Sequence, residues 1–139
     1  MPFITLQYTA AVDAAKAARL ASEIADLACT VLRKDPRRTS VLLRPVDASH
    51  WFIAGQCLAD TGRNAFRLEV TVTDESNTRA DKQRFQREAF ALLSGLFENL
   101  HPHSNVHVID CRASAYGYGG ISQEEHGYRA TAPSAPDRT

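Results

Sequence analysis

The chain has 139 residues, 44% hydrophobic and 23% charged, which suits one domain with a buried core. Its 16 Lys and Arg residues balance its 16 Asp and Glu residues, so composition excludes a strongly charged surface for nucleic acid or an anionic membrane. No apolar run approaches the roughly 20 residues of a membrane span, and the first residues lack the pattern of a signal peptide. We therefore expect a soluble, cytoplasmic protein without a nucleic-acid or membrane partner.

Three cysteines are scattered along the chain at positions 29, 57 and 111. They have neither the spacing of metal ligands nor the even number of a disulfide framework. The sequence also lacks a phosphate-binding loop. We therefore expect no metal and no other cofactor.

A first β-α-β pattern begins with residues 3–8, which alternate in hydrophobicity as a strand does. Asp13 is a suitable N-cap for a helix that continues to Lys34, where Asp35 and Pro36 end it. The apolar stripe of this helix consists of Leu20, Ile24, Leu27 and Val31. Residues 39–46 then predict a second strand.

The same pattern returns 65 residues later. Residues 65–73 alternate as a strand, and Thr78 is the next candidate N-cap. The stripe of the second helix, each residue 65 positions after its counterpart, is Phe85, Ala89, Leu92 and Leu96. The same shift relates Trp51 to Tyr116 and Gly55 to Gly120. A constant shift through a cap, a stripe and a turn indicates an internal duplication.

Two β-α-β units predict an α/β fold, called α+β in some schemes. The strands within each unit should be parallel, joined by a right-handed helical crossover. Together they form a four-stranded sheet with both helices on one face, and further subunits would cover the other face. We expect a single domain over residues 1–139, with repeats at about 2–55 and 65–121 and a flexible tail over 129–139.

Pro2 is the candidate for chemistry at the start of the chain. Removal of Met1, which aminopeptidases carry out before small residues, would leave Pro2 as a free secondary amine. A free α-amino group titrates near pH ~8, and burial lowers its pKa because desolvation disfavours the charged form. Such an amine could act as a general base at neutral pH. The alternative is that Pro2 only begins a strand, where proline is tolerated.

The start MPFITLQ, the β-α-β unit, the Thr-Ser-Val strand at 39–41 and an aromatic–glycine turn resemble the tautomerase superfamily, which includes 4-oxalocrotonate tautomerase (4-OT). The turn corresponds to residues 50–55 and, more closely, to 115–120. The doubled length resembles fused members such as malonate semialdehyde decarboxylase and cis-3-chloroacrylic acid dehalogenase, which are typically trimers. The resemblance spans roughly residues 2–121 and implies a homotrimer that acts on a small carboxylic acid.

The resemblance further implies that Pro2 is the catalytic base and that Arg79 binds the substrate carboxylate. A guanidinium beside a helix N-terminus offers an anion both a bidentate fork and backbone donors. The alternative is a solvated arginine in the first helical turn. The second half begins around Ala65-Phe66-Arg67 without a proline, so we expect one base per chain.

Four further residues are candidate substrate contacts: Trp51, Tyr116, His50 and His107. The two aromatic residues could form apolar walls that keep Pro2 dry, or they could fill contacts between subunits. His50 could steer a carbonyl or carboxylate group, or it could be an exposed turn residue. His107 could line the site, or it could be a partnered histidine of the last strand.

We therefore expect a cofactor-independent tautomerase that isomerises small 2-oxo or 2-hydroxydienoic acids. Other reactions of the superfamily stay open. However, this chain has Leu27 and Ile109 near the positions of the dehalogenase's histidine and tyrosine, and Thr39 near the position of the decarboxylase's aspartate. One alternative is a lyase, either a 3-oxo acid decarboxylase or a haloacrylate dehalogenase or hydratase. Another is a non-catalytic oligomeric module that binds small acids.

Overall fold

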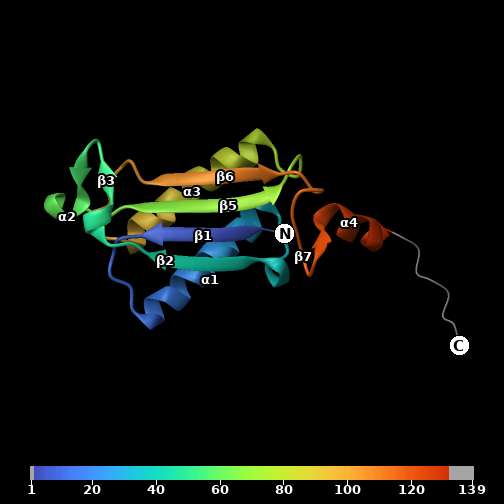
Figure 1. Cartoon of the computed structure of the whole chain (residues 1–139), viewed down its shortest axis with the longest axis horizontal. Coiled ribbons are helices and arrows are strands. Elements are labelled where there is room, and N and C mark those ends of the chain that lie inside the picture. The colour runs from blue at the N-terminus through green and yellow to red at the C-terminus, as the bar shows by residue number, and fades with distance from the viewer. Residues whose placement is uncertain (1, 132–139) are drawn as a thin grey trace, which may run out of the picture.

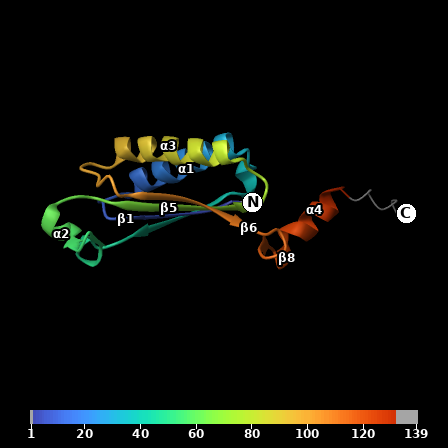
Figure 2. The same cartoon turned by 90° about the horizontal axis from the view of Figure 1, so that it is seen from above.

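The computed structural model describes residues 2–131. Its main sheet has four strands in the order β2-β1-β5-β6. These are β1 (Phe3–Tyr8), β2 (Ser40–Pro45), β5 (Phe66–Thr73) and β6 (Asn105–Cys111). Two long helices, α1 (Ala14–Leu32) and α3 (Arg79–Leu96), lie side by side on one face of this sheet (Figure 1; Figure 2).

The two β-α-β units meet at the centre of the sheet. β1 is parallel to β2, β5 is parallel to β6, and the two central strands are antiparallel, with Leu6 opposite Leu68. This pairing relates the units by an approximate two-fold axis. The predicted fold class, with tandem units and both helices on one face, is confirmed.

Each unit continues into a short hairpin that the sequence analysis did not identify as strands. The hairpin strands are β3 (Phe52–Ile53), β4 (Gln56–Cys57), β7 (Gly117–Tyr118) and β8 (Ile121–Ser122). Both hairpin turns have two consecutive residues with positive φ, Ala54 and Gly55 in one and Gly119 and Gly120 in the other. This is the conformation of tight two-residue hairpin loops.

Short helical segments complete the connections. They are η1 (Pro36–Arg38), η2 (Ala48–His50), α2 (Leu58–Thr61) and α4 (Gln123–Thr131). The hairpin β3–β4 and α2 lie at one end of the sheet, whereas α4 projects beyond the other end (Figure 1; Figure 2). Of the predicted flexible tail, residues 129–131 belong to α4 and residues 132–139 lie outside the described residues. The predicted domain and repeat boundaries stay a prediction.

Both predicted helix caps are present. The Asp13 side chain accepts a hydrogen bond from the backbone N–H of Lys16. Thr78 and Asp81 form a reciprocal capping box, in which each side chain accepts from the other residue's backbone N–H. The first helix ends at Leu32, slightly before the predicted Lys34, because Arg33 takes a left-handed backbone conformation with φ of 55°.

The core lies between the sheet and the two helices. Leu20, Ile24, Phe85 and Ala89 are buried as predicted. Ala28 and Leu93 are fully buried where the predicted stripes had Leu27 and Leu92, which are only partly buried. The same one-residue difference at equivalent positions of the two helices reflects the common geometry of the two units.

The two units differ in length between the first strand and the helix. Ile4 pairs with Val41, and Leu68 pairs with Val106. The second strands are therefore offset by 65 residues, whereas the first strands are offset by 64, since 106 − 41 = 65 and 68 − 4 = 64. The position equivalent to Pro2 is thus Phe66.

The central packing can be tested with the fully buried Leu68. Leu68→Ala should lower the free energy of unfolding by about 2–5 kcal/mol, because it leaves a cavity between sheet and helices. The matched control Leu27→Ala removes the same atoms from a partly buried side chain and should cost less. Urea denaturation measures both values, and an equal loss in the two variants would contradict this core arrangement.

Candidate functional site

Pro2 lies at one end of the sheet, where β1 begins and β5 and β6 end. The register pairs Phe3 with Thr71, so one further step places Pro2 opposite Val72. Pro2 is buried, and its carbonyl oxygen accepts a hydrogen bond from the Ser40 N–H at 3.3 Å. A free nitrogen here would therefore lie between the first and second units.

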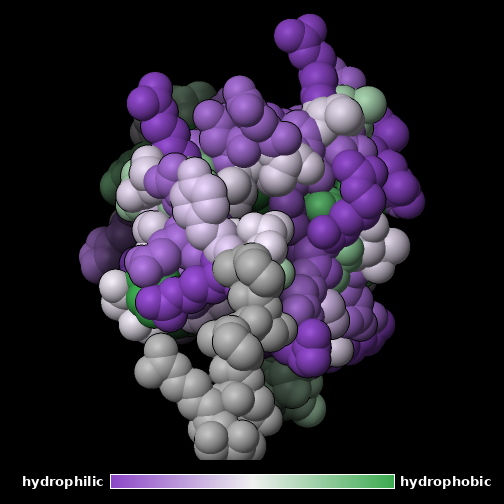
Figure 3. Space-filling model, turned by 90° about the vertical axis from the view of Figure 1, so that its right-hand side faces the viewer, coloured by the Kyte–Doolittle hydropathy of each residue, from purple (hydrophilic) through white to green (hydrophobic). Residues whose placement is uncertain are grey.

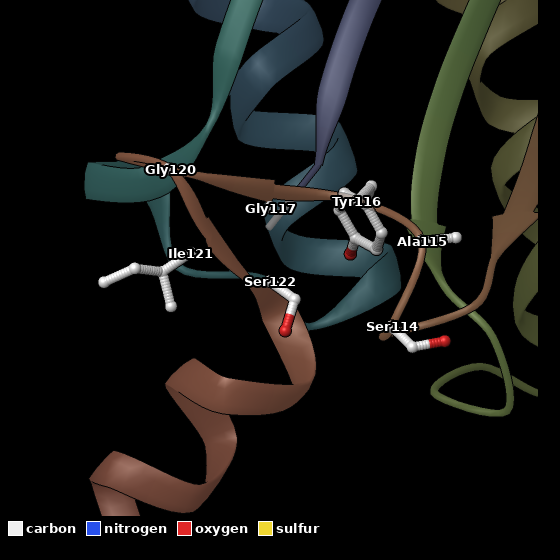
Figure 4. Close-up of a pocket in the computed structure, with 7 residues that line it drawn as sticks. All are labelled: Ser114, Ala115, Tyr116, Gly117, Gly120, Ile121 and Ser122. Carbon is white, nitrogen blue, oxygen red and sulfur yellow. The ribbon is translucent and has the colours of Figure 1, made fainter.

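Tyr116 lies at the same end and lines a hollow of about 300 Å³ together with residues 114, 115, 117 and 120–122. Its hydroxyl shares a hydrogen bond with the hydroxyl of Thr73, the last residue of β5. Figure 4 shows Ile121, which also lines the hollow, pointing to the side away from Tyr116. Burial raises the pKa of the Tyr116 phenol, so it stays a neutral hydrogen-bonding group at physiological pH.

The hairpin that follows Tyr116 packs very closely. A Cβ atom on Gly117 would lie 1.9 Å from the carbonyl oxygen of Ile121, so no larger residue fits without moving the backbone. The equivalent position in the first unit is occupied by Phe52. The two hairpins have therefore diverged in packing while they keep the same turn conformation.

Aromatic contacts anchor this hairpin to the first unit. The Arg38 guanidinium of η1 lies 5.8 Å from the ring centroid of Tyr118, a cation–π contact. The His126 ring of α4 stacks on Tyr118, with 3.9 Å between the ring centroids. These contacts hold the second-unit hairpin near the start of β2, which is next to the start of β1.

Arg79 is the first residue of α3 and follows the end of β5 by a short loop. It is exposed and has no ion pair within residues 2–131. Its neighbour Asp81 instead accepts a hydrogen bond from Arg33 Nη2 at 2.8 Å. The structure therefore brings Pro2, Tyr116 and an unpaired arginine to one end of the sheet. The surface of this end is mostly hydrophilic (Figure 3).

Lys34 also belongs to this end, and the sequence analysis did not single it out. Its ammonium group donates a hydrogen bond to Ser76 Oγ at 2.8 Å, and Ser76 Oγ in turn donates to the carbonyl oxygen of Thr73. Partial burial lowers the pKa of the Lys34 amine. The only sequence signal for Lys34 was the run of basic residues that follows the first helix. Such a run does not reveal which of its residues hydrogen-bonds to a serine.

The other three candidate substrate contacts lie at the opposite end. His50, Trp51 and His107 line a separate hollow of about 650 Å³ together with Gln7 and Arg67. Gln7 is five residues along β1 from Pro2, a separation of about 17 Å in an extended strand. Within one chain these residues do not meet Pro2, and their role in substrate binding stays a prediction.

Two other kinds of feature, a metal-ligand cluster and a membrane-spanning helix, are absent from the described part of the chain. Residues 2–131 contain no group of three or more His, Cys, Asp or Glu residues placed to hold a metal ion. No helix in that part is long and apolar enough to cross a membrane.

Several solved structures share this architecture over nearly the whole chain. The protein Pt0534 inactivated by 2-oxo-3-pentynoate superposes with a TM-score of 0.79 and 17% identity, over 90% of this chain and 98% of that one. A fused 4-OT described as an asymmetric trimer superposes with a TM-score of 0.78 and 12% identity, over 90% of this chain and 98% of that one. The protein N1 of the cis-3-chloroacrylic acid dehalogenase family superposes with a TM-score of 0.72 and 19% identity, over 94% of this chain and 92% of that one. No family model and no curated protein matches the sequence.

The chain therefore has the tautomerase-superfamily fold, with a mixed four-stranded sheet and tandem β-α-β units. More particularly, it has the layout of the fused members, in which one chain carries both units. The resemblance inferred from the sequence is confirmed at this level.

The capping box beside Arg79 makes a pH-dependent contribution to stability. The hydrogen bond from the Thr78 backbone N–H is the main cause that lowers the pKa of Asp81. A lowered folded-state pKa stabilises the protein above the unfolded value near ~3.9, and this stabilisation is lost as the pH falls through the folded value. Asp81→Asn should therefore unfold at lower urea concentration than the parent at pH 7, and the difference should close below about pH 4. A difference that stayed constant across this range would contradict a charged cap.

Proposed function

We propose that the chain is a cytoplasmic, cofactor-independent tautomerase that isomerises small 2-oxo or 2-hydroxydienoic acids. The observation that carries the proposal is the burial of Pro2 at a sheet end that also holds Tyr116 and Arg79, which forms no ion pair within residues 2–131. Likeness to Pt0534, which is inactivated by the acid 2-oxo-3-pentynoate, supports it.

Pro2 serves as the base once Met1 is removed. Burial disfavours the charged amine and lowers its pKa, so a neutral secondary amine is available near pH 7. Its nitrogen takes a proton from an enol hydroxyl or an acidic carbon and returns that proton to another carbon of the same substrate. The reaction gains and loses no atoms overall, so it needs no external reductant or oxidant.

Arg79 binds the substrate carboxylate. A guanidinium without an acidic partner can form two parallel hydrogen bonds to a carboxylate. The positive charge also stabilises the dienolate that develops when Pro2 takes the proton. Tyr116 provides an aromatic wall, and its neutral hydroxyl lies beside the end of β5.

We also propose that the chain forms a homotrimer. The sheet face away from the helices exposes Phe3, Leu42 and Ile109 with 43%, 36% and 36% of their surface accessible. Burying these three apolar side chains stabilises association, and the fused 4-OT of the same fold is described as a trimer. Any contact of His50, Trp51 or His107 with substrate at Pro2 would come from a neighbouring subunit.

A lyase is the second candidate, because N1 of the cis-3-chloroacrylic acid dehalogenase family shares the fold. In that case Pro2 would work in its protonated form, either polarising a 3-oxo acid or assisting water addition to an unsaturated acid. An NMR titration of the Pro2 amine distinguishes the two. A pKa near or below 7 fits a base, whereas a value well above neutrality fits the lyase.

Pro2→Ala should reduce turnover of phenylenolpyruvate or 2-hydroxymuconate by about 10²- to 10⁴-fold, the usual contribution of a general base. The control Pro102→Ala changes an exposed proline at the opposite end of the sheet and should leave turnover unchanged. Intact mass must show that Met1 is absent from the active protein. Retention of Met1 in a fully active sample would rule out Pro2 as the base.

Arg79→Ala should lower kcat/KM for the same acids by about 10- to 100-fold, as expected for loss of a charged hydrogen bond. Arg84→Ala is the matched control, because Arg84 is on the same helix and pairs with Glu88 at 2.7 Å. Steady-state kinetics on both variants gives the comparison. Equal activity of the two variants would place the carboxylate elsewhere.

A further inference from the structure

The hollow at the end of the sheet opposite Pro2 has the features of an acid-binding site. We call it the Arg67 pocket; it is lined by Gln7, His50, Trp51, Arg67, Asn105 and His107, with a volume of about 650 Å³. The approximate two-fold axis of the fold relates this end to the Pro2 end, because β5 begins here as β1 begins there.

The floor of the Arg67 pocket is a row of hydrogen-bond donors. Gln7 lies opposite Arg67 in the β1–β5 register, and Arg67 lies opposite Asn105 in the β5–β6 register. Three neighbouring strands therefore present a guanidinium flanked by two amides on the sheet face away from the helices. This row offers several N–H donors, which is the arrangement that recognises a carboxylate.

Two acidic side chains lie near the pocket: Asp47, whose carboxylate interacts with His50, and Glu69, which contacts Arg67. Glu69 Oε1 lies 2.7 Å from Arg67 Nη2, and 46% of the Arg67 side chain stays accessible. A guanidinium has five N–H donors, so this contact leaves several free. None of the described residues that line the pocket is itself acidic. Glu69 therefore competes with a bound anion without filling the site.

The wall of the Arg67 pocket is aromatic. Trp51 and Phe52 both line it, and Phe52 is 62% exposed. Flat aromatic surfaces pack well against planar unsaturated groups. A ligand with a carboxylate at one end and a planar conjugated body would match both the donor row and this wall.

We propose that the Arg67 pocket is a second binding site for small planar carboxylic acids. The position equivalent to Pro2 is Phe66, whose nitrogen is a peptide amide that donates to Ser104 Oγ at 3.2 Å. An amide nitrogen is no base, so an acid bound here meets no proton acceptor of the Pro2 kind. This proposal does not rest on the proposed Pro2 reaction.

The chain has a single tryptophan, which lines both this pocket and a neighbouring hollow, so its indole N–H resonance reports binding at this end of the sheet, and Arg67→Gln assigns the binding to the pocket. We would titrate cinnamate into the ¹⁵N-labelled Pro2→Ala variant, which separates binding from turnover. The indole resonance should shift and saturate. Arg67→Gln in the same background should weaken cinnamate binding at least about 10-fold, as expected when a charged hydrogen bond is lost.

Two further variants sharpen the test. Glu69→Gln should tighten cinnamate binding several-fold, because it removes the competing carboxylate, and a folding defect would not produce that result. Arg79→Ala, at the other end of the sheet, should leave the titration unchanged. A non-saturating shift, unchanged affinity in Arg67→Gln, or weaker binding in Glu69→Gln would overturn the proposal. Equal weakening in Arg79→Ala would also overturn it, because binding would then belong to the Pro2 end.

Discussion

The antiparallel pairing of β1 with β5 is the constraint on which the rest of the structure depends. It joins the two units through the buried pair Leu6 and Leu68. It also sets the start of β1 beside the end of β5, and α3 follows β5 by a short loop. Pro2 and Arg79 come to one end for this reason. Parallel pairing of the same strands would place Pro2 beside the start of β5 and send Arg79 to the far end.

The same pairing gives the molecule two similar ends with different chemistry. At one end Pro2 begins a strand, and its carbonyl accepts the Ser40 N–H. At the other end Phe66 occupies the equivalent place, but its nitrogen lies within the chain and donates to Ser104. Thr39 is the counterpart of Ser104, and its hydroxyl donates to the Asp35 carbonyl as the Ser104 hydroxyl donates to the His101 carbonyl. A fused chain has only one start, so only one end can have a terminal amine.

Much of the fold follows from periodicity, because alternating strands and amphipathic helices carry strong local signals. The caps at Asp13 and Thr78 were predictable for the same reason. The hairpins were not, since two-residue strands such as Gly117–Tyr118 are too short to show a period. The sequence analysis offered both Trp51 and Tyr116 as possible walls around Pro2, but within one chain Trp51 lies at the opposite end of the sheet. A sequence offset shows that two residues are equivalent, and a two-fold axis places equivalent residues at opposite ends of one chain.

Divergence of the two hairpins fits this division of roles. At the Pro2 end of the sheet, Gly117 permits a backbone contact that any side chain would block, and Tyr118 contacts both Arg38 and His126. At the other end the equivalent of Gly117 is Phe52, which is largely exposed next to Trp51. A closely packed hairpin would restrict motion around the proposed base, which must be aligned for proton transfer. The hollow beside the exposed aromatic hairpin is the larger one, about 650 Å³ against about 300 Å³, which suits the ligand binding proposed there.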